Sequence, residues 1–140
     1  MKNYLIIPLL ILSVGFCQQK KTDKPNPMKG IKTQTVIVYV YETLIRKNIS
    51  KYDSNGNKVE DSSYDSEGSL FWKYNYKYDS NGNMVKELFY DSDEKLDRKS
   101  IWKYNDKNRL DEKIKYKYEL KFGELQETPT IKTVYEYVEY

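Results

Sequence analysis

Few residues of this chain could carry out acid–base or nucleophilic chemistry. The 140-residue sequence has no histidine, and its single cysteine, Cys17, ends an apolar run near the N-terminus. The usual general bases and thiol nucleophiles are therefore missing. Paired carboxylates could still hydrolyse a glycosidic bond, and the candidates are Glu60, Asp61, Glu87 and Glu112. All lie among charged neighbours, which is typical of a solvated strand face with ion pairs, so we predict no catalytic residue and no enzymatic activity.

Two oxygen-rich segments could bind a metal ion. Asp53–Asn57 and Asp79–Asn83 place oxygen ligands at alternate positions around a glycine, as a calcium loop does. The twelfth position of such a loop needs a bidentate glutamate, but it is Tyr64 in one case and Tyr90 in the other. Turn chemistry explains the same residues and is favoured over calcium. Zinc lacks ligands because there is no histidine, and we predict no metal and no cofactor.

Aromatic residues are the best candidates for ligand binding. The chain has 15 tyrosines, 2 tryptophans and 4 phenylalanines. Rings on one strand face could stack against sugar rings, and the candidates are Trp72, Tyr74, Tyr76, Trp102 and Tyr104. The competing interpretation is that these rings form the buried side of a sheet, and it is favoured because a sheet must bury one face. A barrel, a sandwich or a second molecule could cover that face.

The N-terminus has the layout of a bacterial export signal. Lys2 is followed by an apolar run from Tyr4 to Phe16, which is shorter than the ~20 residues of a membrane-spanning helix. Val14-Gly15-Phe16-Cys17 resembles the lipobox of bacterial lipoproteins, although Phe16 departs from the usual small residue. The resemblance implies a diacylglycerol on Cys17 and anchoring to a membrane of the cell envelope, which is the outer membrane if the bacterium is Gram-negative.

Two other interpretations of this segment remain open. It could be a secretory signal cut after Gly15, or the start of a cytosolic chain whose apolar run packs as a core helix. A lone cysteine cannot form an internal disulfide, and lipidation accounts for Cys17 without a dimer. We therefore divide the chain into a signal peptide at 1–16, a flexible tether at 17–30 and a β-repeat domain at 31–140.

A repeat runs through the predicted domain. The heptapeptides Lys51–Asn57 and Lys77–Asn83 are identical and lie 26 residues apart, and Lys103–Arg109 is a weaker third copy at the same spacing. Half-repeats at Tyr64–Gly68 and Tyr90–Glu94 begin 12 residues after the tyrosines of the two identical heptapeptides, Tyr52 and Tyr78. Periodicity of this kind indicates a repeat architecture.

Each repeat predicts a strand, a turn and a second strand. Asn-Gly between alternating runs is a hairpin signal, and short loops make successive strands antiparallel neighbours. Period-two alternation is clear in Leu70–Tyr78 and Ile114–Phe122, and gives one aromatic and one mostly charged face. Strand-forming runs also occupy Thr35–Thr43 and Ile131–Tyr140. We expect an all-β antiparallel meander of about eight strands, as an open rolled sheet or a barrel-like one.

The repeat resembles the tyrosine-aspartate (YD) repeats of the Rhs family. The shared pattern is Tyr-Asp-x-x-Gly-Asn, present at Tyr52–Asn57 and Tyr78–Asn83, and the resemblance covers about residues 44–118. It implies hairpins wound into one large sheet, and a link to carbohydrate binding or to enclosing a toxin domain. This array is too short to enclose another domain, so we do not expect the shell function here.

Charge and composition narrow the partners. With 24 basic and 21 acidic residues, the formal net charge is +3. This mixed surface lacks the basic face that nucleic acids need, so we expect no nucleic-acid partner. We predict an exported, lipid-anchored binding or scaffolding module for a glycan or protein ligand. The alternative is a small envelope lipoprotein that inhibits a toxin or enzyme, or gives immunity to it. The oligomeric state stays open.

Overall fold

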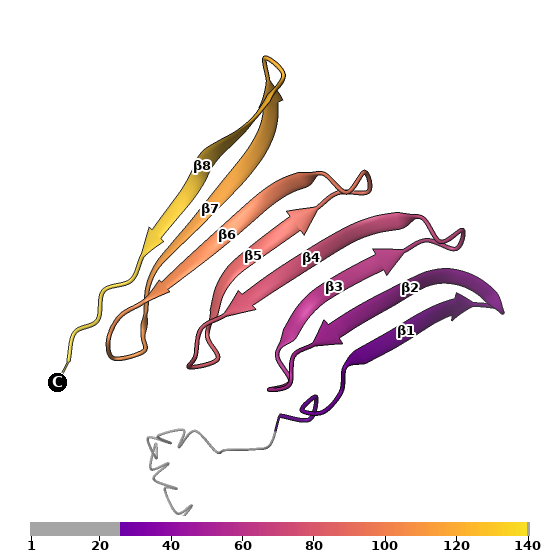
Figure 1. The fold of residues 1–140 in the computed structure, drawn as a ribbon, viewed down its shortest axis with the longest axis horizontal. Coiled ribbons are helices and arrows are strands. Elements are labelled where there is room, and N and C mark those ends of the chain that lie inside the picture. The colour runs from indigo at the N-terminus through magenta and orange to yellow at the C-terminus, as the bar shows by residue number, and fades with distance from the viewer. Residues whose placement is uncertain (1–25, 140) are drawn as a thin grey trace, which may run out of the picture.

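A computed structural model describes residues 26–139 as one antiparallel sheet, and confirms the all-β meander of eight strands. The strands pair in chain order from the first to the eighth (Figure 1). They are β1 (Thr33–Val40), β2 (Thr43–Tyr52), β3 (Lys58–Tyr64), β4 (Leu70–Tyr78), β5 (Met84–Tyr90), β6 (Leu96–Tyr104), β7 (Leu110–Lys121) and β8 (Glu124–Val134). β1 and β8 do not pair with each other, so the sheet is open and the barrel-like alternative is wrong.

The sheet is a single layer. Each strand contacts only the strands before and after it in sequence. Within residues 26–139 no hydrophobic side chain is buried, and the buried residues are Gly56 and four serines, Ser50, Ser62, Ser63 and Ser100. The expectation that the aromatic face forms a covered core is therefore not met in the described part of the chain.

Five of the seven turns that join consecutive strands share the same pattern of hydrogen bonds between a side chain and the backbone. In the first, the Asp53 carboxylate accepts hydrogen bonds from the backbone N–H groups of Asn55 and Asn57, both at 2.9 Å. The fourth residue of each turn has positive φ, which glycine adopts without strain. Glycine fills it in three turns, whereas Glu94 and Asn108 adopt φ of 59° in the other two. The five turns are Asp53–Asn57, Asp65–Ser69, Asp79–Asn83, Asp91–Lys95 and Asn105–Arg109.

A β-bulge follows each of these turns. In the hairpin of β4 and β5, Tyr78 pairs with Met84 but Lys77 pairs with Lys86, so Val85 is an extra residue. The other hairpins repeat this shift just before the tyrosine that ends the first strand, and the five extra residues are Val59, Phe71, Val85, Asp97 and Asp111. Such bulges raise the local twist and change which side chains face each other.

The first and last hairpins have a different turn. Tyr41 and Glu42 have φ of 48° and 68°, and Phe122 and Gly123 have φ of 53° and 84°. Two successive positive φ values are typical of the type I′ turn that suits two-residue hairpins. These turns correct the sequence expectations: the run 35–43 is divided at Tyr41, and the run 114–122 leaves the strand at Phe122. The C-terminal run is strand only as far as Val134.

The strand ends form two rims. The turns Asp53–Asn57, Asp79–Asn83 and Asn105–Arg109 lie together at what we call the proximal rim, and the remaining four turns lie at the distal rim (Figure 1). The described chain begins at the proximal rim, because the Asn26 side-chain amide donates a 2.8 Å hydrogen bond to the carbonyl oxygen of Gly56. The end of the predicted tether is thus held against the turn Asp53–Asn57.

The predicted signal segment, Cys17 and the rest of the predicted tether lie outside the described residues. In residues 26–139 there is no helix with the length and hydropathy needed to cross a membrane.

Candidate functional site

Strand register places the aromatic residues of the middle strands on one face of the sheet. Trp72, Tyr74 and Tyr76 alternate along β4, and Tyr74 pairs with Phe89 of β5. Tyr76 connects by successive pairs through Glu87 to Ser100 of β6, two residues from Trp102. We call this side the aromatic face, and define it by Trp72, Tyr74, Tyr76, Phe89 and Trp102.

The rings of β4 form a ladder along the strand. Tyr74 and Tyr76 are stacked, with ring planes 4° apart and centroids 6.0 Å apart. Trp72 meets Tyr74 edge to face at 5.4 Å, and Phe89 lies 4.9 Å from Tyr74 at a tilt of 52°. Such geometries are worth ~0.5–1.5 kcal/mol per pair beyond the area they bury. Because these rings are only half-buried, a ligand can reach them from solvent.

Cations continue the ladder on the neighbouring strands. The Arg98 guanidinium lies 4.1 Å from the centroid of the Phe89 ring, and the Lys113 ammonium lies 4.5 Å from that of Trp102. Lys115 and Lys117 follow Lys113 on the same side of β7. The expectation of one aromatic and one charged face is therefore wrong, because the charged side of β7 belongs to the aromatic face.

A cleft lies where the rings meet the cations. It has a volume of about 370 Å³ and extends across residues of β4 to β8. Its aromatic walls are Tyr74, Phe89 and Trp102, while Lys115 and Ile131 contribute from β7 and β8. The cleft is open to solvent, which suits part of an extended ligand better than an enclosed small molecule.

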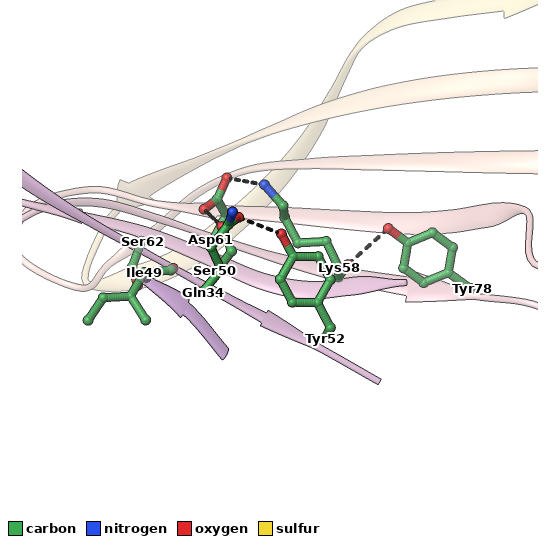
Figure 2. Close-up of polar contacts among 8 residues, drawn as sticks. All are labelled: Gln34, Ile49, Ser50, Tyr52, Lys58, Asp61, Ser62 and Tyr78. Atoms are coloured by element: carbon green, nitrogen blue, oxygen red, sulfur yellow. Dashed lines mark hydrogen bonds and ion pairs between the residues drawn. The ribbon is translucent and has the colours of Figure 1, made fainter. Parts of the chain in front are cut away.

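Acidic groups flank the other end of the ladder. Asp61 accepts hydrogen bonds from the Ser50 hydroxyl at 2.7 Å and from the Lys58 ammonium at 3.0 Å (Figure 2). Burial, together with the charges of Asp61 and Glu87, raises the pKa of Tyr76 well above its usual range. The Tyr76 hydroxyl therefore stays protonated and can donate a hydrogen bond at any physiological pH.

Tyr104 is placed away from the ladder. Its hydroxyl donates to the backbone carbonyl of Met84 at 3.1 Å, near the proximal rim. Tyr78 makes the equivalent bond to Lys58 at 2.9 Å, and Tyr52 donates to the Gln34 side chain at 3.1 Å (Figure 2). The five predicted binding aromatics therefore lie on one side of the sheet, and Tyr104 differs from the others in that its hydroxyl bonds to the backbone near the proximal rim.

Register divides the four carboxylates considered for hydrolysis between the two faces of the sheet, with Asp61 and Glu87 on the aromatic face and Glu60 and Glu112 on the other. Glu60 pairs with Lys51 at 2.7 Å, and Asp61 has the contacts given above. Glu112 lies 2.8 Å from Lys103 and 2.5 Å from Lys132, and hydrogen bonds from these two lysines lower its pKa. A carboxylate held ionised in this way is a poor general acid.

The oxygen-rich turns are occupied by their own hydrogen bonds. Both carboxylate oxygens of Asp53 and of Asp79 accept hydrogen bonds inside their turns. Across residues 26–139 no three Asp, Glu, His or Cys side chains gather in a way that could hold a metal ion.

Phe89, Arg98 and Lys113 belong to the face but were missed by the sequence reasoning. The hairpin signals were visible, but the bulge that shifts each register by one residue was not. Because each register shift lies next to a repeated tyrosine, the positions of these tyrosines are the sequence signal that could have identified the three residues.

No protein-family model matches the chain, and no curated protein matches it. Solved structures with a similar fold include the crystal structure of a DUF3836 family protein from Bacteroides vulgatus. It is 16% identical, with a TM-score of 0.38, over 75% of this chain and 99% of that one. A protein of unknown function from Bacteroides fragilis is 12% identical, with a TM-score of 0.33, over 74% of this chain and 92% of that one.

Proposed function

We propose that this protein is a non-enzymatic carbohydrate-binding module, held at the bacterial cell envelope by a lipid on Cys17. The observation that carries the binding role is the ladder of Trp72, Tyr74 and Tyr76 on a face that no second layer of the described chain covers. Its rings extend over four residue steps of β4, which is about 13 Å in a strand. That is an extended surface rather than a pocket for one small molecule.

The chemistry of the face suits a sugar chain. The C–H faces of sugar rings are apolar and stack on aromatic rings, while sugar hydroxyls need polar partners at the side. Asp61 and Glu87 lie on either side of Tyr76 as acceptors, and the Tyr76 hydroxyl remains a donor. A protein ligand would instead favour a larger continuous apolar patch, which the charges of β7 interrupt.

The position of the N-terminal end of the described chain supports anchoring. The described chain begins at the proximal rim, and Asn26 follows Cys17 by nine residue steps. Nine steps of extended chain can span at most about 30 Å. A lipid on Cys17 would hold the proximal rim toward the membrane and leave the aromatic face accessible. The resemblance of the turns to YD repeats, which are linked to carbohydrate binding, points to the same class of ligand.

Tryptophan fluorescence tests the binding role. Titration of residues 18–140 with neutral and acidic oligosaccharides should change the emission of Trp72 or Trp102. Trp72→Ala should weaken binding by about five- to 150-fold, because one stacked ring contributes about 1–3 kcal/mol in comparable ring–ring recognition. The matched control is Tyr90→Ala, which removes a ring that contacts Lys73 on the opposite face. Equal losses in both variants, or no response to any saccharide in a broad panel, would contradict the proposal.

Lipid labelling tests the anchor. Cys17→Ser should abolish incorporation of a labelled fatty acid in bacteria and leave the unprocessed precursor. Normal processing of this variant would instead favour a secretory signal cut after Gly15.

A further inference from the structure

The cleft on the aromatic face has an uneven distribution of charge. Four basic side chains of its lining lie on the aromatic face with one carboxylate, Glu87, and they are Arg98, Lys113, Lys115 and Lys117. Lys99 also lines the cleft, but its ammonium lies on the opposite face, 4.3 Å from the centroid of the Tyr116 ring. Since the whole chain has nearly balanced charges, this cleft is a local concentration of positive charge beside exposed rings.

Two of these cations have no acidic partner in the described chain. Lys99, Arg98 and Lys117 each form an ion pair, with Glu127, Asp97 and Glu119 respectively. Lys113 and Lys115 form none with any carboxylate of residues 26–139. The Lys113 ammonium instead lies over the Trp102 ring, and Lys115 is exposed beside Ser100.

The nearby carboxylate does not neutralise this pair. Glu87 accepts a hydrogen bond from the Ser100 hydroxyl at 3.4 Å and lies on the side of the cleft toward Tyr76. The aromatic face is thus acidic near Tyr76 and basic from β6 to β7. A ligand that satisfies both ends must combine ring faces and hydroxyls with negative charge.

We propose that the cleft selects a saccharide that carries anionic groups, with a sugar ring against Trp102 and its acidic substituent at Lys113 and Lys115. This inference rests on the proposed carbohydrate-binding function and adds the class of sugar. Carboxylates of uronic acids and sulfate esters both supply the required charge, and the experiment below separates them.

Calorimetric titration compares three probes of similar length: a cello-oligosaccharide, an oligogalacturonate and a sulfated carrageenan oligosaccharide. At low salt the protein should bind at least one anionic probe about tenfold more tightly than the neutral one, and added salt should remove most of that difference. The better anionic probe identifies the acidic group. Equal affinity for all three probes overturns the inference and leaves carbohydrate binding intact, while binding of none overturns both.

Charge-neutralising variants locate the effect. Lys115→Gln should weaken binding of the preferred anionic probe three- to tenfold and weaken binding of the neutral probe by a smaller factor. Lys113→Gln should act similarly. Lys77→Gln is the matched control, because it removes the same charge from an exposed residue on the opposite face of β4. Equal effects of Lys115→Gln and Lys77→Gln would show general attraction by net charge and overturn the site.

Discussion

Gly56 has a role beyond closing its turn, because the N-terminal segment lies against it. A Cβ atom there would lie 2.7 Å from both the Asn26 side-chain nitrogen and the Lys29 backbone nitrogen. At Gly68, which has a similar φ of +88°, a Cβ atom would meet nothing within 4 Å. The two glycines separate the cost of backbone conformation from the cost of contact.

Alanine at these two positions should therefore differ in effect. Gly68→Ala should lower the free energy of unfolding by ~1–2 kcal/mol, the cost of a left-handed conformation for a residue with a Cβ atom. Gly56→Ala should cost more, since it must also displace Asn26 and Lys29. Urea unfolding measures both variants, and equal losses would mean that the N-terminal segment does not hold the turn in solution.

The turn aspartates give stability a dependence on pH. Hydrogen bonds from Asn57 lower the pKa of Asp53, and hydrogen bonds from Asn83 lower that of Asp79. A carboxylate with a lowered pKa in the folded state stabilises the fold above its ordinary value of 3.8. That contribution is lost as the pH falls through the lowered pKa.

The double variant Asp53→Asn, Asp79→Asn should show a smaller loss of melting temperature between pH 5 and pH 2 than the wild type. Asparagine already accepts the same bonds at Asn105, so the turns can persist. Circular dichroism at a series of pH values measures the effect. An unchanged acid dependence would assign it to other carboxylates.

At the scale of the strand, the register between neighbouring strands is the feature that the sequence did not predict. Tyrosine spacing and Asn-Gly turns were sufficient to predict the meander, because both are local signals. Counting back from the pair of Tyr78 with Met84, an uninterrupted ladder would place Leu88 opposite Tyr74. The bulge at Val85 puts Phe89 there instead.

A shift of one residue moves a strand's side chains to the other face. This is why the common face of the β4 rings was predicted, whereas Phe89, Arg98 and Lys113 on the neighbouring strands were not. The alternation of the run 114–122 holds as far as Lys121, but its charged side lies on the aromatic face rather than opposite it. Each of the five bulges shifts the pairing of one strand with the next by one residue. The alternation within a single strand does not show these shifts.

Tyrosine hydroxyls fasten the hairpins at the proximal rim. Tyr104→Phe should lower the free energy of unfolding by about 1 kcal/mol, because it removes the bond to the Met84 carbonyl while keeping the ring. Tyr41→Phe is the control, since Tyr41 is 98% exposed and its loss of a hydroxyl should have no measurable effect. Equal stability of the two variants in urea would show that the Met84 bond adds nothing beyond solvation.

At the scale of the whole molecule, the two edge strands differ in their protection. All eight residues of β1 are exposed, and none of Thr33–Val40 is charged. β8 carries Pro129 and several charged residues, which oppose pairing with another strand. The β1 edge should therefore govern association at high concentration.

Val36→Lys should reduce concentration-dependent association, measured by light scattering, because it places a charge on the exposed β1 edge. Gln126→Lys on β8 adds the same charge at the opposite edge and is the control. If the two variants behave alike, net charge rather than the β1 edge controls association.

The contacts of the sheet make the cooperativity of its unfolding pass from each strand only to the next one along the array. Because each strand touches only its two neighbours, opening can begin at either end of the array without disturbing the middle. Amide hydrogens of β1 and β8 should then exchange with solvent first and those of β4 and β5 last. The aromatic ladder lies on those two strands, so the surface that we assign to ligand binding belongs to the segment that local unfolding reaches last.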